Sequence, residues 1–340
     1  MPLTIHYRLR LQRLLMLIAL MILAGFASST ATSAQDAIPS PGDDQAIPIS
    51  NLLASSDSIF GVLVIDHHDQ IAFEQNADVP FISASLYKLV LLAEMLDRVE
   101  AGTLSLDQPL TIRQDFFLIA NGEDSYFSVD AVGIKVTLEE LIYSTAAYSS
   151  NVGAQALFSL TSHARLDAFA KDLGLTQTRY GIPADQAAEF YRSPSDGTPS
   201  LAFLRSIAFI ESFVRGGTVN LTTPRDMARF FRLLRDDQLV SPLVSWRIKQ
   251  LLDARVINDR MPALLPPGTK VIHKTGNLDG VVHDAGIIET DAGPLIVITL
   301  AQAVTDAETT ISIEQRVALH VYDLGTDSAV PVSRVLGYYA

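Results

Sequence analysis

The chain has 340 residues, 48% of them hydrophobic and 19% charged, so it can bury a large core without disulfides or structural metals. It contains no cysteine, which excludes thiol catalysis, cysteine-ligated zinc and iron–sulfur clusters. The formal net charge is −13. A chain this acidic is a poor nucleic-acid binder, and it would repel anionic substrates unless a local cationic pocket overrides its field.

The N-terminus has the layout of a secretory signal. Three arginines within the first thirteen residues precede a continuous apolar run over residues 14–26, and small residues follow, with Ala31 and Ala34 as candidate cleavage sites. This run is shorter than the roughly 20 residues that a spanning helix needs. We therefore predict a signal peptide over residues 1–34 and export, with an uncleaved membrane anchor as the alternative. Cleavage would change the net charge from −13 to −16, because it removes three arginines and no acidic residue.

The next segments change from linker to folded chain. Residues 35–50 are rich in Pro, Asp and Ser and predict a flexible linker. The β-prone runs 60–65 and 71–75 flank a polar turn, which predicts a hairpin. Apolar residues recur at helical spacing over residues 85–99 and predict a mostly buried helix.

The rest of the chain predicts a helical region followed by a return to strands. Thr137 with Glu140 forms a capping box, and Thr223 before Pro224 is an N-cap followed by a proline at the first helical position. The predicted helices are residues 138–148, 152–160, 165–173, 224–236 and 311–324, and the predicted strands are residues 270–274, 281–289 and 294–301. This order predicts an α+β fold, in which an antiparallel sheet from both chain ends is flanked by helices and carries an all-helical lobe. We place this domain at residues 51–325, before a C-terminal tail over residues 326–340.

The first chemical motif is Ser85-Leu86-Tyr87-Lys88 at the start of a predicted helix. Residues three apart on a helix share one face, so the lysine can reach the serine hydroxyl, which needs a base to become a nucleophile. A helix N-terminus also favours a developing oxyanion. The alternative is a serine N-cap with an ordinary exposed lysine, although Lys88 lies among apolar residues.

The second motif is Ser149-Ser150-Asn151, between two predicted helices. A hydroxyl and an amide two residues apart on a turn can point into one site. A helix C-cap followed by an N-cap is an equally simple interpretation of this motif.

The third motif is Lys274-Thr275-Gly276, at the end of a predicted strand. The lysine and threonine can hold a carboxylate, and the glycine lets a substrate backbone approach the strand edge.

Together and in this order, the three motifs resemble those of the class A β-lactamases and penicillin-binding proteins. The resemblance covers about residues 50–325 and includes the segments 81–96, 138–157, 220–234 and 273–288. It implies a β-lactamase/transpeptidase-like α/β sandwich and an exported serine hydrolase that opens β-lactam amides through an acyl-enzyme. It also implies no cofactor, a small β-lactam or D-Ala-D-Ala peptide as substrate, and a monomer.

The resemblance assigns the acyl-transfer roles by position. Ser85 would be acylated, with Lys88 as its base or as part of a proton relay. Ser149 would pass the proton to the leaving nitrogen, and Asn151 would hydrogen-bond the substrate amide.

The same resemblance assigns the substrate-edge strand. Lys274 and Thr275 would bind the substrate carboxylate, next to Gly276. The backbone N–H groups of Ser85 and Asn277 would form the oxyanion hole. A further basic residue usually assists the carboxylate from the following strand, where His283 is the candidate, although its charge depends on pH and Asp284 lies beside it.

Two departures from the family pattern bear on activity. Ser150 stands where β-lactamases usually have a mainly structural aspartate. Class A enzymes also carry an Ω-loop glutamate that activates the deacylating water, and that position falls near Ala184. Asp185 is the nearest substitute, with Glu189 and Glu211 further along. The segment 190–217 is also longer than the family's loop.

These departures leave alternatives open. Without a carboxylate at the ester, acylation would proceed while deacylation stalls, as in a D-alanyl-D-alanine carboxypeptidase or penicillin-binding enzyme. A non-catalytic binding domain that kept the fold is the third possibility. None of the seven histidines has metal-ligand spacing, so no metal site is expected. Tyr126 either lines the cleft or is a packed aromatic.

Overall fold

The computed structural model describes residues 48–118, 124–191 and 199–326. The predicted signal peptide, most of the predicted linker and residues 327–340 of the predicted tail lie outside these ranges. Within them, no helix is both long and apolar enough to cross a membrane.

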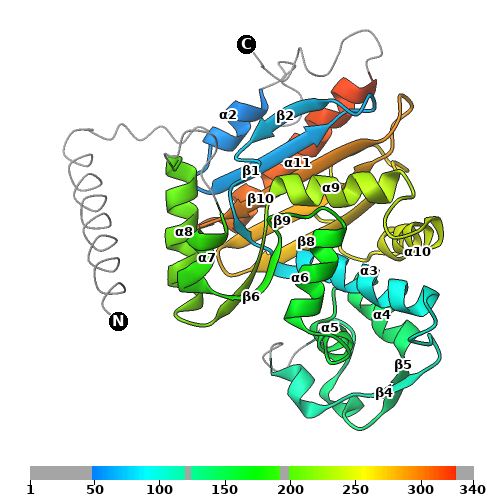
Figure 1. Ribbon diagram of the computed structural model, residues 1–340. Helices are drawn as coiled ribbons and strands as arrows, with labels where there is room; N and C mark the ends of the chain where they lie inside the picture. The colour runs from blue at the N-terminus through cyan, green and yellow to red at the C-terminus, as the bar shows by residue number, and fades with distance from the viewer. Residues whose placement is uncertain (1–47, 119–123, 192–198, 327–340) are drawn as a thin grey trace, which may run out of the picture. The chain divides into compact units, whose positions relative to one another are not determined.

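The main sheet takes its strands from both ends of the chain (Figure 1). They are β1 (Ile59–Ile65), β2 (Ile71–Gln75), β8 (Val271–Leu278), β9 (Val281–Ile288) and β10 (Leu295–Gln302). Their order is β2-β1-β10-β9-β8, and every neighbouring pair is antiparallel. The predicted fold class is confirmed, and β8 lies at one edge of the sheet.

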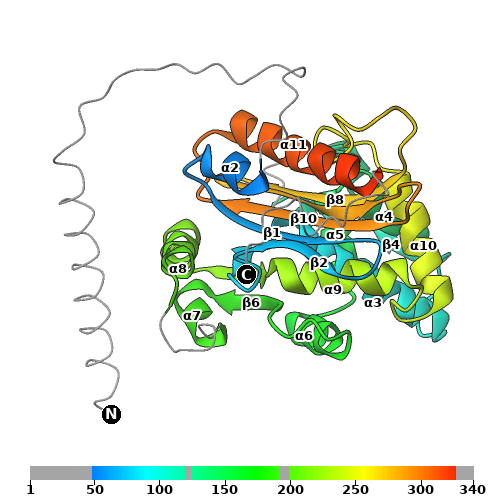
Figure 2. The ribbon, with the colours of Figure 1, turned by 90° about the horizontal axis from the view of Figure 1, so that it is seen from above.

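Helices cover both faces of this sheet (Figure 2). On one face, α2 (Ile49–Ala54) and α11 (Ala307–Thr326) pack on alternate residues of β1 such as Val62. On the other face, α9 (Pro224–Arg235) packs on the intervening residues such as Leu63. All residues of β1, β9 and β10 are therefore buried, which explains why β1 is apolar throughout and why β9 and β10 do not alternate apolar with polar residues.

A helical lobe lies beside the sheet (Figure 1). It consists of η1 (Ala84–Leu86), α3 (Tyr87–Glu100), η2 (Gln114–Phe117), η3 (Val129–Ala131), α4 (Leu138–Ala147), α5 (Asn151–Phe158), α6 (His163–Asp172) and α10 (Pro242–Asp253), with the ribbon of β4 (Pro109–Thr111) and β5 (Lys135–Thr137). The predicted caps are present, because Thr137 Oγ1 accepts from the Glu140 N–H and Thr223 Oγ1 from the Asp226 N–H, each at 3.2 Å.

Several elements were not predicted. The long segment expected as a loop contains α7 (Ala187–Phe190) and α8 (Leu201–Val214), and α10 had no prediction. Both longer helices begin at a serine N-cap, Ser200 and Ser241, which was an available signal. A second sheet of β3 (Phe81–Ile82), β7 (Thr218–Thr222) and β6 (Arg179–Pro183), followed by η4 (Ala184–Gln186), was also missed.

Two boundaries differ in ways that matter for the site. Strand β8 continues past Lys274 to Leu278, because Leu278 pairs with Val281 across a two-residue turn whose Gly280 has φ 68°. The third motif therefore lies inside an edge strand instead of at its end. At the other end of the domain, α2 begins at Ile49, two residues inside the predicted linker, and buries that side chain completely.

Candidate active site

Ser85 lies in η1, the short turn that leads into α3. The preceding Ala84 has φ 44°, an uncommon conformation for a residue with a side chain. The Ser85 hydroxyl is partly exposed and has no hydrogen-bond partner among the described residues. Strand β8 lies against this turn, since a Cβ at Gly276 would be 3.1 Å from that of Ala84. The serine is thus held at the edge of the sheet with its hydroxyl free to react.

Lys88 is completely buried one turn beyond Ser85. Its Nζ donates to Ser149 O at 2.6 Å and to Asn151 Oδ1 at 2.7 Å. A neutral amine that donates two N–H groups in this way keeps a lone pair to accept a proton. Burial lowers the pKa of Lys88 to about 7, with Asp124 raising it and Arg255 lowering it further. The lysine therefore has the protonation behaviour that a general base near neutral pH requires.

Ser149 lies in the turn between α4 and α5, in the left-handed region with φ 57°. This conformation brings its hydroxyl between two lysines: Lys274 Nζ donates to Ser149 Oγ at 2.8 Å, and Lys88 Nζ is 3.4 Å from it. The first and second motifs and the lysine of the third thus meet around one hydroxyl. Asn151 joins the same group through Lys88.

A third buried cation, Arg255, completes a positive pocket that the sequence analysis missed. It follows α10, and its Nη2 donates to Thr275 Oγ1 at 2.7 Å. Burial lowers the pKa of Arg255 to about 10, so it remains charged at neutral pH. Burial, together with the positive charges of Arg255 and Lys88, also holds the pKa of Lys274 well below its usual value. Arg255 and Lys274, which both donate to Thr275, are suitable partners for an anionic group.

Asn277 is held by a second buried arginine. Arg260 is fully buried and donates to Asn277 Oδ1 and, at 2.6 Å, to His283 O. This contact fixes the part of β8 whose backbone N–H the sequence analysis assigned to the oxyanion hole.

His283 does not fit its predicted role in carboxylate binding. The ring is completely buried, Nε2 donates to Ile82 O at 2.7 Å, and Nδ1 accepts from the Ala301 N–H at 3.1 Å. Burial lowers the pKa of His283 to about 4, so the ring is neutral at physiological pH. The prediction was wrong because it considered only the strand after the third motif, whereas Arg255 supplies a cation from the segment before it.

The acidic residues expected near the ester lie apart from the lysine–serine group. Asp185 in η4 and Glu189 in α7 are exposed, and no described hydrogen bond or ion pair connects either of them to that group. Glu211 lies on α8, and partial burial, together with the nearby charge of Asp185, raises its pKa. None of these side chains has a described contact with Ser85, Lys88 or Ser149.

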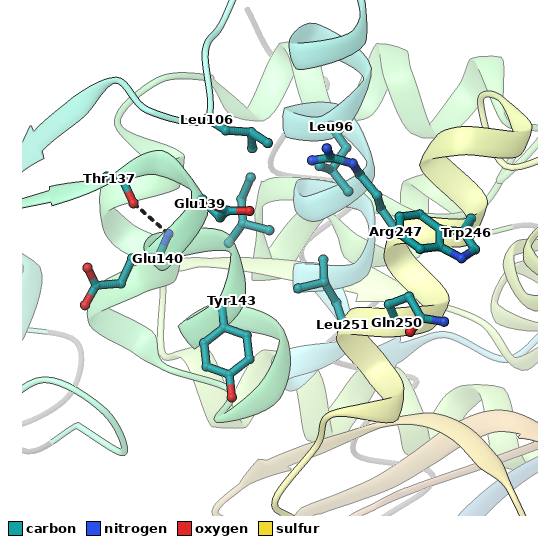
Figure 3. Close-up of a pocket in the computed structure, with 11 residues that line it drawn as sticks. Leu96, Leu106, Thr137, Glu139, Glu140, Tyr143, Trp246, Arg247, Gln250 and Leu251 are labelled. Carbon is teal, nitrogen blue, oxygen red and sulfur yellow. Dashed lines mark hydrogen bonds between the residues drawn. The ribbon is translucent and has the colours of Figure 1, made fainter.

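Two other features lie outside the lysine–serine group. Tyr126 is 37% exposed and packs edge-on against Tyr148, with ring centroids 4.9 Å apart, directly before Ser149. A cavity of about 560 Å³ lies between α3, α4 and α10, where Tyr143 and Trp246 line it with apolar side chains (Figure 3). This cavity contains none of the motif residues and is separate from the candidate active site.

The antiparallel sheet, the helical lobe and the group of Ser149 with two lysines have the architecture of the β-lactamase-like serine hydrolases. The chain belongs to the beta-lactamase enzyme family, whose model matches residues 47–324.

Solved structures have the same fold. A β-lactamase from Xanthomonas campestris is 24% identical with a TM-score of 0.65, covering 81% of this chain and 95% of its own. A β-lactamase from Sphaerobacter thermophilus is 20% identical with a TM-score of 0.63, and the match covers 80% and 94%. PBP-A is 19% identical with a TM-score of 0.65, covering 81% and 94%, and a variant of it was solved as an acyl-enzyme complex with penicillin G.

Proposed function

We propose that this chain is an exported active-site-serine hydrolase that opens β-lactam amides through an acyl-enzyme on Ser85. The observation that carries the proposal is the hydroxyl of Ser149, which lies between Lys88 and Lys274. Ser85, one turn before Lys88, has a hydroxyl with no hydrogen-bond partner among the described residues. Nucleophile, base, proton carrier and anion-binding cations are thus all available in one site.

Acylation follows from these positions. Neutral Lys88 takes the proton of the Ser85 hydroxyl as Oγ attacks the lactam carbonyl carbon. The developing oxyanion accepts hydrogen bonds from the backbone N–H groups of Ser85 and Asn277. The C–N bond then breaks. The ring nitrogen receives a proton through Ser149, and Lys88 supplies the replacement proton, so the lysine ends the step neutral.

Substrate orientation is assigned to the positive pocket. The carboxylate of a penicillin would pair with Lys274 and Arg255 and accept a hydrogen bond from the Thr275 hydroxyl, which lies 2.7 Å from Arg255 Nη2. Gly276 leaves room for the substrate backbone along the edge of β8, and the Asn151 side-chain amide would donate to the substrate's acylamino carbonyl.

A second function is favoured by the position of Asp185. Because this carboxylate is exposed and has no described contact with the lysine–serine group, water activation at the ester has no evident base. A D-alanyl-D-alanine carboxypeptidase or penicillin-binding enzyme, whose β-lactam acyl-enzyme persists, is consistent with this arrangement. Asp185 remains the candidate for deacylation under the first proposal.

One labelling experiment tests both functions. Purified protein is mixed with penicillin G or nitrocefin, and intact mass is followed over time together with nitrocefin absorbance. Under the first proposal the acyl adduct appears and decays while product accumulates beyond one equivalent. Under the second, a stoichiometric burst is followed by a stable adduct, and D-alanine is released from a Lys-D-Ala-D-Ala peptide.

Controls identify the nucleophile. The adduct should be absent in Ser85→Ala and present in Ser56→Ala, a matched change at a serine outside the site. Absence of any adduct, together with no nitrocefin product and no D-alanine release, in the folded wild-type protein would leave only a non-catalytic binding domain and would refute both enzymatic proposals.

A further inference from the structure

Asp124 is distant in sequence from the 149–151 turn but makes several hydrogen bonds to it. Its Oδ1 accepts from the backbone N–H groups of Asn151 at 2.7 Å and Val152 at 3.1 Å. Its Oδ2 accepts from the Ser150 hydroxyl at 2.8 Å. These donors form the first turn of α5, where unpaired N–H groups and the helix dipole favour a negative charge.

The same carboxylate also holds its own segment. Oδ2 accepts from the N–H groups of Tyr126 at 3.1 Å and Phe127 at 3.0 Å, while Ser125 Oγ donates to Tyr148 O at 2.7 Å. The segment 124–127 is therefore tied to both ends of the 149–151 turn. No other described side chain links the segment to this turn through so many bonds.

Ser150 takes part in the same chain of contacts. It donates to Asp124 and accepts from the Gly153 N–H at 2.8 Å, so it caps α5 while the carboxylate caps the two preceding amides. The middle residue of the motif is neutral, and the anion that organises the turn comes from a separate segment.

The position of this turn determines the surroundings of Lys88. Lys88 Nζ donates to Ser149 O and Asn151 Oδ1, and both belong to the turn that Asp124 holds. We propose that Asp124 is a positioning residue for acyl transfer, which fixes the 149–151 turn against Lys88 and places a negative charge near this lysine. The inference rests on the proposed function, because it assigns a role within that reaction.

Asp124 stays ionised, and its negative charge should raise the pKa of Lys88. Burial alone would raise the pKa of Asp124, but the hydrogen bonds from Phe127, Val152 and Ser150 outweigh burial and hold the pKa below its usual range. Among the described residues, two charged groups act on Lys88: Asp124, which raises its pKa, and Arg255, which lowers it. The ring of Tyr87 lies 5.9 Å from Nζ, and Lys274, whose own pKa is held well below its usual value, shares the Ser149 hydroxyl with Lys88. Removal of Asp124 leaves burial and Arg255 unopposed, so the pKa of Lys88 should fall.

The test compares Asp124→Asn with wild type and with Asp130→Asn, which removes an equal charge at an exposed position of the same segment. Acylation by penicillin G is measured by intact mass as a function of pH. Lys88 is titrated in parallel by NMR of ¹³C-labelled lysine, with Lys88→Arg to assign its signal. We expect Asp124→Asn to lower the maximal acylation rate at least about tenfold and to move the Lys88 midpoint to lower pH, while Asp130→Asn changes neither.

The outcomes are distinguishable. An unchanged Lys88 midpoint in Asp124→Asn overturns the inference, even if the rate falls, because loss of a structural contact alone would leave the titration in place. A wild-type rate in Asp124→Asn also overturns it. If wild type forms no adduct, the proposed function fails, and the NMR titration still decides the role of Asp124. If Asp124→Asn does not fold, Asp124→Glu keeps the charge and should keep the midpoint, whereas Ser150→Ala should lower the rate without moving it.

Discussion

The substitution Arg255→Gln tests the positive pocket most directly. It removes a buried charge and keeps a donor for Thr275 Oγ1, which accepts from Arg255 at 2.7 Å. Two opposite charges 4 Å apart interact by about 4 kcal/mol at an effective dielectric constant of about 20. Hydrogen bonds to charged groups contribute about 1.5–3 kcal/mol net. We therefore expect kcat/KM, or the acylation rate, for penicillin G to fall about 10- to 150-fold.

The assay separates the carboxylate from the rest of the substrate. Penicillin G and its methyl ester are compared in wild type, Arg255→Gln and Arg247→Gln, a matched change on α10 outside the pocket. At a pH above the acid limb of all three proteins, the ester should react equally with each. Because Arg255 lowers the pKa of Lys88, its loss should also move the acid limb of acylation above pH 7. An equal loss for acid and ester, with no shift of that limb, would refute the pairing of Arg255 with the carboxylate.

Three further predictions concern the base, the candidate water activator and a helix cap. Lys88→Met should lower the acylation rate about 10²- to 10⁴-fold, measured by intact mass, because the general base is lost, and wild-type acylation should rise with pH through about 7 as Lys88 deprotonates. Asp185→Asn should leave the decay of the acyl-enzyme within about twofold, because the side chain is exposed; a larger slowing, seen by mass after removal of free penicillin, would support Asp185 as the water activator. Thr223→Ala should cost about 1 kcal/mol in urea unfolding, since the N-cap of α9 is lost, while Thr269→Ala, at an exposed turn, should cost less.

Sequence analysis was effective where local pattern determines structure. The apolar runs of the main sheet predicted β1, β9 and β10 because both faces of these strands are buried. The motif spacing was similarly informative, since the order of Ser85, Ser149 and Lys274 along the chain was enough to suggest one site.

The parts that were missed depend on contacts between distant segments. Asp124 and Arg255 lie outside regular elements, so no periodicity marks them, and their partners at Ser150 and Thr275 are reached only after folding. Because β9 is buried on both faces, its sequence has no alternation of apolar and polar residues. Without that alternation, the sequence could not show whether His283 faces the interior or the cleft. Charge alone could not distinguish a functional arginine from a solvated one.

The pairing of β1 with β10 has a consequence for biosynthesis. Ile59 lies opposite Gln302, so β1 can pair with β10 only after most of the chain has been synthesised. Contacts this distant in sequence slow folding and leave strand edges bare in the meantime. Chaperone dependence of the nascent chain is therefore expected, and a stop codon placed before β8 should yield insoluble product instead of a smaller folded domain.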